Sequence, residues 1–298
     1  MVDVKYYNAD SLSYLKTIPD NSIPLVITDP PYGINFHSQN DPDTGWDKFN
    51  ENEFEDFLKQ WLTEVYRILT PTGTLWMFFA PTTVNTVFKV VDNVGFTNHL
   101  ENWAVLARAK GRGASKKLKS VREDVLHLTK DPKKYTWHSV EYLREVIAPY
   151  TKDGKPRGWA LDESTGQRVR WTGVGNVMFY TMPYYLGVGE RQIHSCQKPL
   201  LLWARLIMQS SDIGEVVLDP FMGSGSSGIS AIMCERNFIG CEIDKDMFDK
   251  ASNWIEVFKD PNSRTSEKLE EYFKKHVSSN EKGFKFNFEK RLILPKEI

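Results

Sequence analysis

The sequence is poor in cysteine, in net charge and in long apolar segments. Its 298 residues include three cysteines, with no C-x-x-C pair and no histidine pattern that would complete a zinc site, which argues against a disulfide framework and a zinc finger. The odd cysteine count and the lack of a secretory segment predict a reducing, cytoplasmic setting. No apolar run approaches the ~20 residues that cross a bilayer. The net charge of −1 excludes a molecule that is basic overall, so any contact with nucleic acid must rest on a local patch.

Near its start the sequence carries the tetrapeptide Asp29-Pro30-Pro31-Tyr32, directly after the apolar run 23–27. The prolines fix φ and remove two backbone donors, so the carbonyl between them is not satisfied by ordinary local hydrogen bonding. Asp29 adds a carboxylate acceptor, and Tyr32 adds a flat aromatic face. This platform suits a planar molecule whose exocyclic NH2 group donates to Asp29 and to the Pro30 carbonyl while its ring stacks on Tyr32. The alternative is a plain strand-to-loop turn.

Short apolar runs and helical spacing alternate along most of the chain. The predicted strands are 4–8, 25–28, 74–79, 95–106, 125–128, 215–218 and 238–241. The predicted helices are 11–16, 53–69, 84–91, 200–211 and 226–235. This alternation predicts an α/β fold with a mostly parallel sheet covered by helices on both faces. Residues 131–191 mix aromatics, glycines and charges without a long period, which indicates an inserted module.

A glycine-rich segment, Asp219 to Gly228, lies between a predicted strand and a predicted helix. Gly223, Gly225 and Gly228 satisfy the G-x-G-x-x-G spacing, and Glu242 at the end of the next strand could accept both hydroxyls of a ribose. This spacing fits NAD and S-adenosylmethionine alike, and a tight turn without a ligand stays open. Asp219 favours S-adenosylmethionine, because a carboxylate would repel a pyrophosphate but suits the ammonium of a methionine moiety.

Together, the two segments resemble the amino-methylating DNA methyltransferases of the restriction-modification type. The resemblance is to the beta arrangement, in which the D-P-P-Y element precedes the cofactor loop. Further matching segments are Asn8-Ala9-Asp10-Ser11, Trp46-Asp47-Lys48-Phe49, Arg67 to Gly73, and His194 to Pro199. The last of these departs from the family's H-P-T-Q-K-P, because Ser195 and Cys196 replace Pro-Thr. The resemblance implies a Rossmann-like S-adenosylmethionine-dependent methyltransferase sheet with helices on both faces and an inserted target-recognition module.

The resemblance also implies roles by position. Asp29, Pro30, Pro31 and Tyr32 would form the catalytic platform for a base extruded from DNA. The residues implied for the cofactor S-adenosyl-L-methionine are Asp10, Ser11, Asp29, Lys198, Asp219, Pro220, Phe221, Gly223, Ser224, Gly225, Ser226, Glu242 and Ile243. Of these, Lys198 would lie near the cofactor's carboxylate, and Asp10 and Ser11 would border its adenine. The reaction needs no metal and no covalent intermediate.

A basic run offers a grip on DNA. It comprises Arg108, Lys110, Arg112, Lys116, Lys117, Lys119 and Arg122, with no acid between them. A charge run is usually a solvated surface loop, but beside a base-modifying site it favours contact with the phosphate backbone. Base reading would fall to the insert, where the candidates are Arg144, Arg157, Gln167, Arg168 and Arg170.

The predicted organisation has four parts. They are a catalytic half (1–130), a target-recognition region (131–191), the cofactor-binding half of the same core (192–260) and a C-terminal extension (261–298). The expected activity is site-specific transfer of a methyl group to N6 of a flipped adenine, since D-P-P-Y goes with adenine and S-P-P-Y with cytosine in the family. The alternatives are an N4-cytosine methyltransferase and, more distantly, an NAD-dependent oxidoreductase. Double-stranded DNA is the expected partner, and no contact with a membrane is expected. A homodimer and a cognate restriction endonuclease that acts separately are left open.

Overall fold

The computed structural model describes residues 2–36, 47–96, 100–112, 118, 120–146, 150–163, 166–179, 193–194, 196–260, 262–263, 267–271, 277–280 and 283–286. The chain divides into two compact units. Unit 1 comprises Met1–Trp137 and Asn176–Glu270, and unit 2 comprises His138–Gly175 and Glu271–Ile298. Among the described residues, none of the helices combines the length and the apolar character that crossing a bilayer would require.

Unit 1 is built on an eight-stranded sheet with the order β1-β13-β12-β2-β3-β5-β4-β11. Its strands are β1 (Val4–Asn8), β2 (Ile23–Thr28), β3 (Leu69–Phe79), β4 (Leu100–Arg112), β5 (Ser120–Thr129), β11 (Val177–Phe179), β12 (Val216–Asp219) and β13 (Asn237–Glu242). Strands β1, β13, β12, β2 and β3 run parallel to one another, while β5 is antiparallel to both β3 and β4. The predicted α/β class with a mostly parallel sheet is confirmed.

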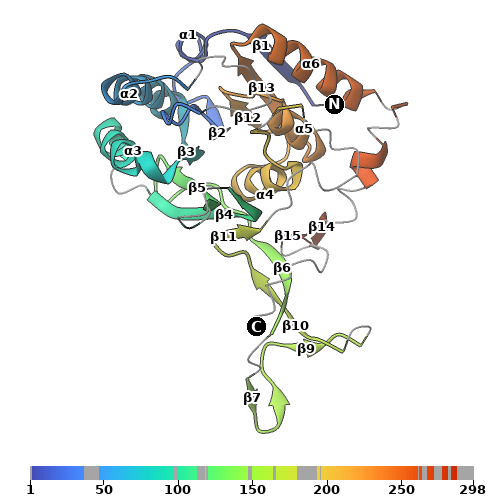
Figure 1. Cartoon of the computed structure of the whole chain (residues 1–298). Helices are drawn as coiled ribbons and strands as arrows, with labels where there is room; N and C mark the ends of the chain where they lie inside the picture. Colours follow the sequence, from blue (N-terminus) through green and yellow to red (C-terminus); the bar gives the residue numbers. More distant parts are fainter. Residues whose placement is uncertain are drawn as a thin grey trace. The chain divides into compact units, whose positions relative to one another are not determined.

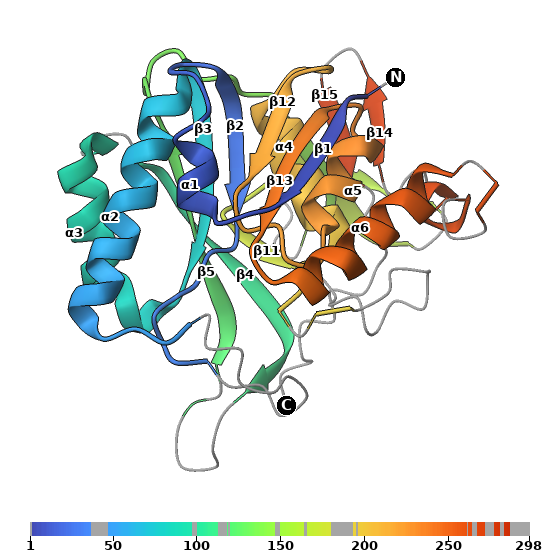
Figure 2. The same cartoon turned by 90° about the horizontal axis from the view of Figure 1, so that it is seen from above.

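Helices cover both faces of this sheet. They are α1 (Ser11–Leu15), α2 (Glu51–Ile68), the short η1 (Pro81–Thr83), α3 (Val84–Val91), the π-turn η2 (Asp92–Phe96), α4 (Leu200–Ser210), α5 (Ser226–Met233) and α6 (Lys245–Lys259). Figures 1 and 2 show α1, α2 and α3 on one face and α4, α5 and α6 on the other. This two-sided cover explains why the central strands β2 and β12 are apolar almost throughout.

Helix α2 shows how the sequence dictates these elements. Asn50 caps its start, since the Asn50 side chain accepts from the backbone of Glu53 and the Glu53 side chain accepts from the backbone of Asn50. The apolar residues recur at helical spacing, so that Trp61 and its neighbours on that stripe are buried in the main core. Strand β3 follows directly and alternates, with Trp76 hydrogen-bonded to Ser210 of α4 and Met77 in the core shared with α2.

The sheet order places two distant parts of the sequence next to each other. Strands β12 and β2 are paired in parallel, with Val217 opposite Leu25 and Leu218 opposite Val26. Their carboxyl ends therefore meet at one edge, at the point where the chain order of the strands reverses. In open α/β sheets such a switch point is where ligands bind. The segments that follow these two strands are the D-P-P-Y element and the glycine-rich loop.

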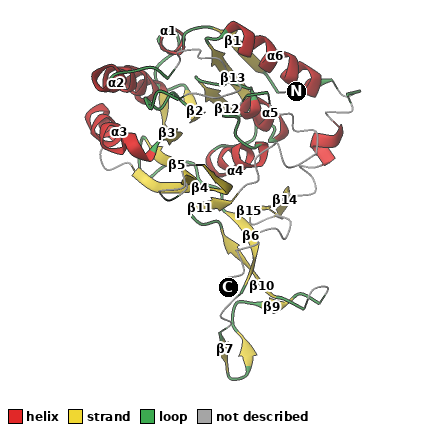
Figure 3. Cartoon of the chain, in the orientation of Figure 1, coloured by secondary structure: helices red, strands yellow, loops and turns green. Residues whose placement is uncertain are grey.

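Unit 2 contains several short strands joined by loops among its described residues (Figure 3). They are β6 (Val140–Glu145), β7 (Thr151–Lys152), β8 (Lys155–Pro156), β9 (Ala160–Leu161), β10 (Arg168–Gly173), β14 (Val277–Asn280) and β15 (Gly283–Phe286). Five of these strands form a sheet in the order β14-β15-β6-β10-β9, and β7 and β8 form a hairpin. This unit thus combines residues from the predicted insert with residues from the predicted C-terminal extension.

Some elements differ from the sequence-based expectations. Helix α6 was not anticipated, and β11, inside the predicted insert, pairs with β4 of the main sheet. The predicted strand 95–106 begins only at Leu100, because Gly95 at φ 117° belongs to the turn after α3. Strands β4 and β5 extend further than the apolar residues alone suggest. Most of the predicted C-terminal extension, 261–298, lies outside the described residues.

Candidate functional site

The D-P-P-Y element begins one residue after the end of β2. The Asp29 side chain is 18% exposed, and its Oδ1 accepts a hydrogen bond from the Tyr32 hydroxyl. Pro30 is buried, whereas Pro31 and Tyr32 are partly exposed. The structure therefore brings the predicted carboxylate and the predicted aromatic side chain into direct contact at the edge of the sheet.

Asp47, one residue of the Trp-Asp match, organises the segment after the D-P-P-Y element. Its side chain is buried, and its two oxygens accept backbone hydrogen bonds from Tyr32, Gly33, Ile34 and Phe36 at 2.7–3.1 Å. Four backbone donors thus converge on a single side chain. Asp47 thereby fixes the path of the chain immediately beyond the aromatic platform.

Lys198 lies in the same cluster, although it is far from Asp29 in the sequence. Its ammonium forms ion pairs with Asp29 and, at 3.1 Å, with Glu123 of β5. It also lies over the Phe78 ring, with Nζ 4.9 Å from the centroid. The segment leading into α4 therefore contributes a buried cation to the catalytic end of β2.

The glycine-rich loop after β12 has the backbone of a ligand cradle. Gly223 and Gly225 have φ of 49° and 79°, a conformation that favours glycine, and a Cβ on Gly223 would meet no atom within 4 Å. Gly228 has a different reason, since its Cβ would stand 2.8 Å from the Phe238 ring. Gly223 thus leaves open space in the loop. A Cβ on Gly225 would stand 3.1 Å from Ile255 of α6, and Gly228 allows α5 to pack closely on β13.

Asp219 lies at the base of this loop and is 2% exposed. Its carboxyl accepts hydrogen bonds from Ser227 Oγ at 2.6 Å and from the Phe221 backbone at 3.1 Å. Burial raises the pKa of Asp219 to about 7, and the nearby Asp29 charge acts in the same direction. A buried carboxyl with so high a pKa is suited to a cationic ligand group, which would restore its negative charge.

Two serine hydroxyls, one from α5 and one from α1, hold the loop in place. Ser226 accepts a hydrogen bond from the Trp203 indole at 3.0 Å, and Ser11 donates to the Pro220 carbonyl. Ser224 is buried. The hydroxyls of Ser226 and Ser11 are thus engaged within the protein, so these residues shape the loop from behind.

Glu242 ends β13 beside the loop. It accepts from the backbone of Gly223 at 3.0 Å and from that of Asp244 at 2.8 Å. Burial raises its pKa, while these two backbone donors lower it. Ile243, the next residue, is 63% exposed, although it is a large apolar side chain. The pair offers an acid and an apolar surface at the rim of the cradle.

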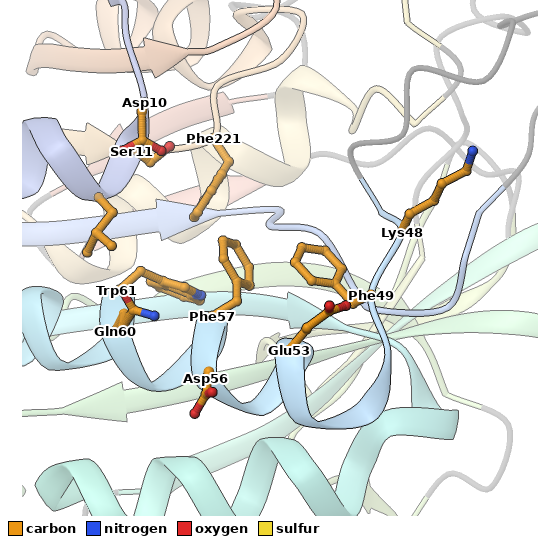
Figure 4. A pocket seen from close by; sticks show the side chains of 11 residues that line it. Asp10, Ser11, Lys48, Phe49, Glu53, Asp56, Phe57, Gln60, Trp61 and Phe221 are labelled. Atoms are coloured by element: carbon orange, nitrogen blue, oxygen red, sulfur yellow. The ribbon is translucent and has the colours of Figure 1, made fainter.

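A pocket of about 520 Å³ opens next to this loop (Figure 4). Its lining comprises Asp10, Ser11, Leu12, Lys48, Phe49, Glu53, Asp56, Phe57, Gln60, Trp61 and Phe221. The Phe221 ring packs edge-on against Phe57 and Trp61, with centroids 5.8 and 5.5 Å apart. Aromatic walls with acids at the rim suit a flat, amine-bearing ring. Asp10 itself caps α1 by accepting from the Ser13 backbone.

The basic run is only partly described. Arg108, Lys110 and Arg112 belong to β4 rather than to a loop, while Lys116, Lys117 and Lys119 lie outside the described residues. Arg122 belongs to β5 and pairs with the buried Asp124 at 3.0 Å. Since Ala107 pairs with Arg122 and Arg112 with Ser120, the described part of the run is gathered at one end of the β4–β5 ladder.

Several residues of the site were not singled out from the sequence. Phe57 and Trp61 stand four positions apart on α2, and this spacing also suits ordinary core residues, so it gave no distinct signal. Glu123 stands just before the apolar residues 125–128, and its local sequence carries no signal of burial. Asp47 belongs to a segment that matches the family, but its local sequence does not indicate the hydrogen bonds that it accepts from residues 32–36.

Comparisons with known proteins agree with this geometry. The family model for N6/N4 DNA methylases matches residues 23–253. The DNA adenine methyltransferase YhdJ of Escherichia coli is 31% identical over 262 residues, covering 84% of this chain and 82% of that protein. The type II methyltransferase M.HpaI of Haemophilus parainfluenzae is 29% identical over 256 residues, covering 86% of this chain and 75% of that protein.

Solved structures show the same fold. The cytosine-N4-specific PvuII DNA methyltransferase has a TM-score of 0.61 at 16% identity and covers 91% of each chain. The complex of M1.HpyAVI with S-adenosylmethionine has a TM-score of 0.53 at 21% identity, covering 84% of this chain and 99% of that one. S-adenosylmethionine is the cofactor, which removes the NAD alternative. The chain belongs to the N6/N4 family of amino-methylating DNA methyltransferases.

Proposed function

We propose that the chain transfers a methyl group from S-adenosylmethionine to the exocyclic N6 of adenine in DNA. The observation that carries the proposal is the meeting of Asp29 and Asp219 at the ends of the paired strands β2 and β12. Adenine is supported by the acid that opens the D-P-P-Y element. It is also supported by the 31% identity to the DNA adenine methyltransferase YhdJ of Escherichia coli. Cytosine N4 is the alternative.

The platform suits the chemistry of an aromatic amine. The lone pair of the amine is delocalised into the ring, which makes the nitrogen a poor nucleophile. If Asp29 and the Pro30 carbonyl accept its two hydrogens, the nitrogen becomes pyramidal and its lone pair is freed. Asp29 can then take the proton as positive charge develops. When bound, S-adenosylmethionine supplies the electrophilic methyl group. Alignment of this kind can lower the barrier by roughly 7–11 kcal/mol.

Tyr32 would compensate part of the cost of base extrusion. Taking a base out of the duplex costs a few kcal/mol of stacking and pairing. Stacking of the extruded base on the Tyr32 ring would return about 1–3 kcal/mol, by analogy with sites that bind single strands. The Tyr32 hydroxyl donates a hydrogen bond to Asp29, which holds the ring beside the carboxylate that would accept the target amine.

The residues of the cradle offer a partner for each part of the cofactor. Asp219 would hold the ammonium, and the open space at Gly223 would let the methionine part approach the backbone. Glu242 would take the ribose hydroxyls, with Ile243 against the adenine. The aromatic pocket at Phe221 would receive the edge of the cofactor's adenine ring. A contact between Lys198 and the cofactor's carboxylate would require the Lys198 ammonium to leave Asp29.

We infer two regions of DNA contact. The basic end of the β4–β5 ladder would bind phosphates. In unit 2, Arg168 and Arg170 are exposed and lie two positions apart on β10, and Arg170 pairs in register with Arg144 of β6. The guanidinium of Arg168 lies 5.7 Å from the Trp159 ring centroid, which limits the positions it can adopt. These arginines, with Arg157 and Gln167, are the candidates for base reading.

Mapping of modified positions tests the proposal. The chain should be expressed in a host without its own DNA methylation, beside an Asp29→Ala variant, and methylated positions should be mapped by sequencing. We expect N6-methyladenine at one recurring sequence with the wild type and none with the variant. Modified cytosine at a recurring sequence would favour the N4 alternative. A homodimer and a separate endonuclease stay predictions.

A further inference from the structure

A buried cluster of three charges joins parts of the chain that are distant in sequence. Lys198, which is 4% exposed, pairs with Asp29 from the end of β2 and with Glu123 from β5. The Glu123 side chain is 7% exposed, and its Oε2 lies 3.1 Å from Lys198 Nζ. Neither the family match nor the sequence motifs assign a role to Glu123.

The fold points Glu123 toward this cluster. Phe78 of β3 pairs in register with Val125 of β5, and Glu123 lies two residues before Val125 on the same strand. Because side chains alternate across a strand, Glu123 shares the face of the sheet that carries Phe78. The Lys198 ammonium lies over the Phe78 ring on that face. The strand therefore holds Glu123 beside the cation.

Both carboxylate oxygens of Asp29 are engaged within the protein. Oδ1 accepts from the Tyr32 hydroxyl, and Oδ2 pairs with the Lys198 ammonium. An amine that donates to Asp29 must therefore replace one of these two partners. If Lys198 gives way, its buried ammonium needs another acceptor, because an unpaired buried charge is strongly unfavourable. Glu123 is already within ion-pair distance.

We propose that Glu123 is a positioning residue that holds Lys198 while Asp29 engages the target amine. This inference rests on the proposed function. With Lys198 neutralised by Glu123, Asp29 keeps its negative charge for the nitrogen that becomes positive during methyl transfer. Without the Glu123 charge, Lys198 remains on Asp29 and competes with the amine.

The test is single-turnover methyl transfer to unmethylated genomic DNA at saturating S-adenosylmethionine. Glu123→Gln should lower the rate about 10- to 100-fold, the range expected for loss of the charge in a close, buried ion pair. Its affinity for S-adenosylmethionine should stay within about threefold of the wild type, because the substitution leaves Asp219 and Glu242 of the cradle unchanged and acts through Lys198 on Asp29. Glu123→Asp retains the charge and should recover much of the rate.

A second background separates this role from a merely structural one. In Lys198→Gln there is no ammonium to hold, so adding Glu123→Gln should change the rate by less than about threefold. Glu256→Gln is the matched control, since Glu256 also pairs with a lysine at 3.0 Å but lies on α6 and is half exposed. Thermal unfolding of each variant reports any general loss of stability.

Three outcomes would overturn the inference. They are a wild-type rate in Glu123→Gln, an equal loss with and without Lys198, and an Asp variant as slow as the Gln variant. A wild type that transfers no methyl group to any DNA would overturn the proposed function and this inference with it. A normal wild type beside an unaffected Glu123→Gln would overturn this inference alone.

Discussion

The carboxylate of Asp47 accepts a 2.8 Å hydrogen bond from the backbone N–H of Tyr32, fifteen positions earlier in the chain. Three more backbone donors, up to Phe36, converge on the same side chain. Gly33 and Asn35 adopt positive φ within this segment, at 68° and 50°. The turn that carries the aromatic platform is therefore held by one buried carboxylate.

Substitution of Asp47 should damage catalysis more than cofactor binding. Asp47→Asn places an NH2 group where backbone donors now point, so two of the hydrogen bonds are lost and Tyr32 is displaced. We expect methyl transfer to slow about 10- to 100-fold, with S-adenosylmethionine affinity within about threefold of the wild type, as displacement of a positioned group predicts. Rates and calorimetric affinities check this. Asp249→Asn, in an exposed pair with Lys245, is the control. Equal rates in the two variants would refute the role of Asp47.

Asp29→Asn should remove activity while leaving both ligands bound. The amide cannot accept the proton from the target nitrogen, and its NH2 group would repel the incoming amine. We expect the methyl-transfer rate to fall by at least about 10²-fold, the lower range for loss of a general base. Binding of S-adenosylmethionine and of a DNA duplex, followed separately, should change little. A variant that still methylates at a wild-type rate would exclude Asp29 from the mechanism.

Asp219 predicts a proton release on cofactor binding. Its pKa is raised from 3.8 to about 7, so the neutral form stabilises the folded protein. This contribution is fully present below pH 3.8 and is lost as the pH rises through 7. The cofactor's ammonium would instead favour the carboxylate. The affinity of the protein for the cofactor should therefore increase with pH in the range just below the pKa of Asp219, by up to about tenfold per pH unit.

Calorimetry at about pH 6.5, in two buffers with different ionisation enthalpies, measures this release directly. We expect the observed binding enthalpy to differ between the buffers for the wild type and to be the same in both for Asp219→Asn. A wild type without a buffer-dependent enthalpy would contradict the pairing of Asp219 with the ammonium.

Gly228 should tolerate no side chain, for reasons of packing. A Cβ at this position would lie 2.8 Å from the Phe238 ring. Gly228→Ala should therefore lower the free energy of unfolding by about 1–3 kcal/mol, as overpacking does. Chemical denaturation measures the loss, and Phe238→Leu in the same chain should recover part of it. Gly173→Ala, where a Cβ would meet no atom within 4 Å, is the control. An equal loss at both positions would contradict the packing argument.

The sequence predicts the two motifs well because each is local. The D-P-P-Y element and the glycine loop are continuous segments, and the residue types within each segment determine its backbone conformation. The α/β class follows for the same reason, from periods that short windows contain. Their meeting point could be expected only through the family resemblance, since no local pattern reports that β2 and β12 are neighbours.

The supporting residues are harder to predict because their roles come from tertiary contacts. Glu123 reaches Lys198 because of the register of β5 against β3. Asp47 can accept its hydrogen bonds because Gly33 and Asn35 adopt positive φ in the segment that donates them. Helix α6 escaped notice although Trp254 and Phe258 give it an apolar stripe. Ser226, expected at the cofactor, is turned toward Trp203 by the packing of α4 on α5.

The most direct measurement is the identity of the methylated nucleoside. Purified enzyme should be incubated with unmethylated DNA and S-adenosylmethionine that carries a deuterated methyl group, and the digested nucleosides should be analysed by mass spectrometry. The account predicts the label in N6-methyladenine, with none when Asp29 is replaced by alanine. Label in N4-methylcytosine alone, or no label in DNA, would contradict it.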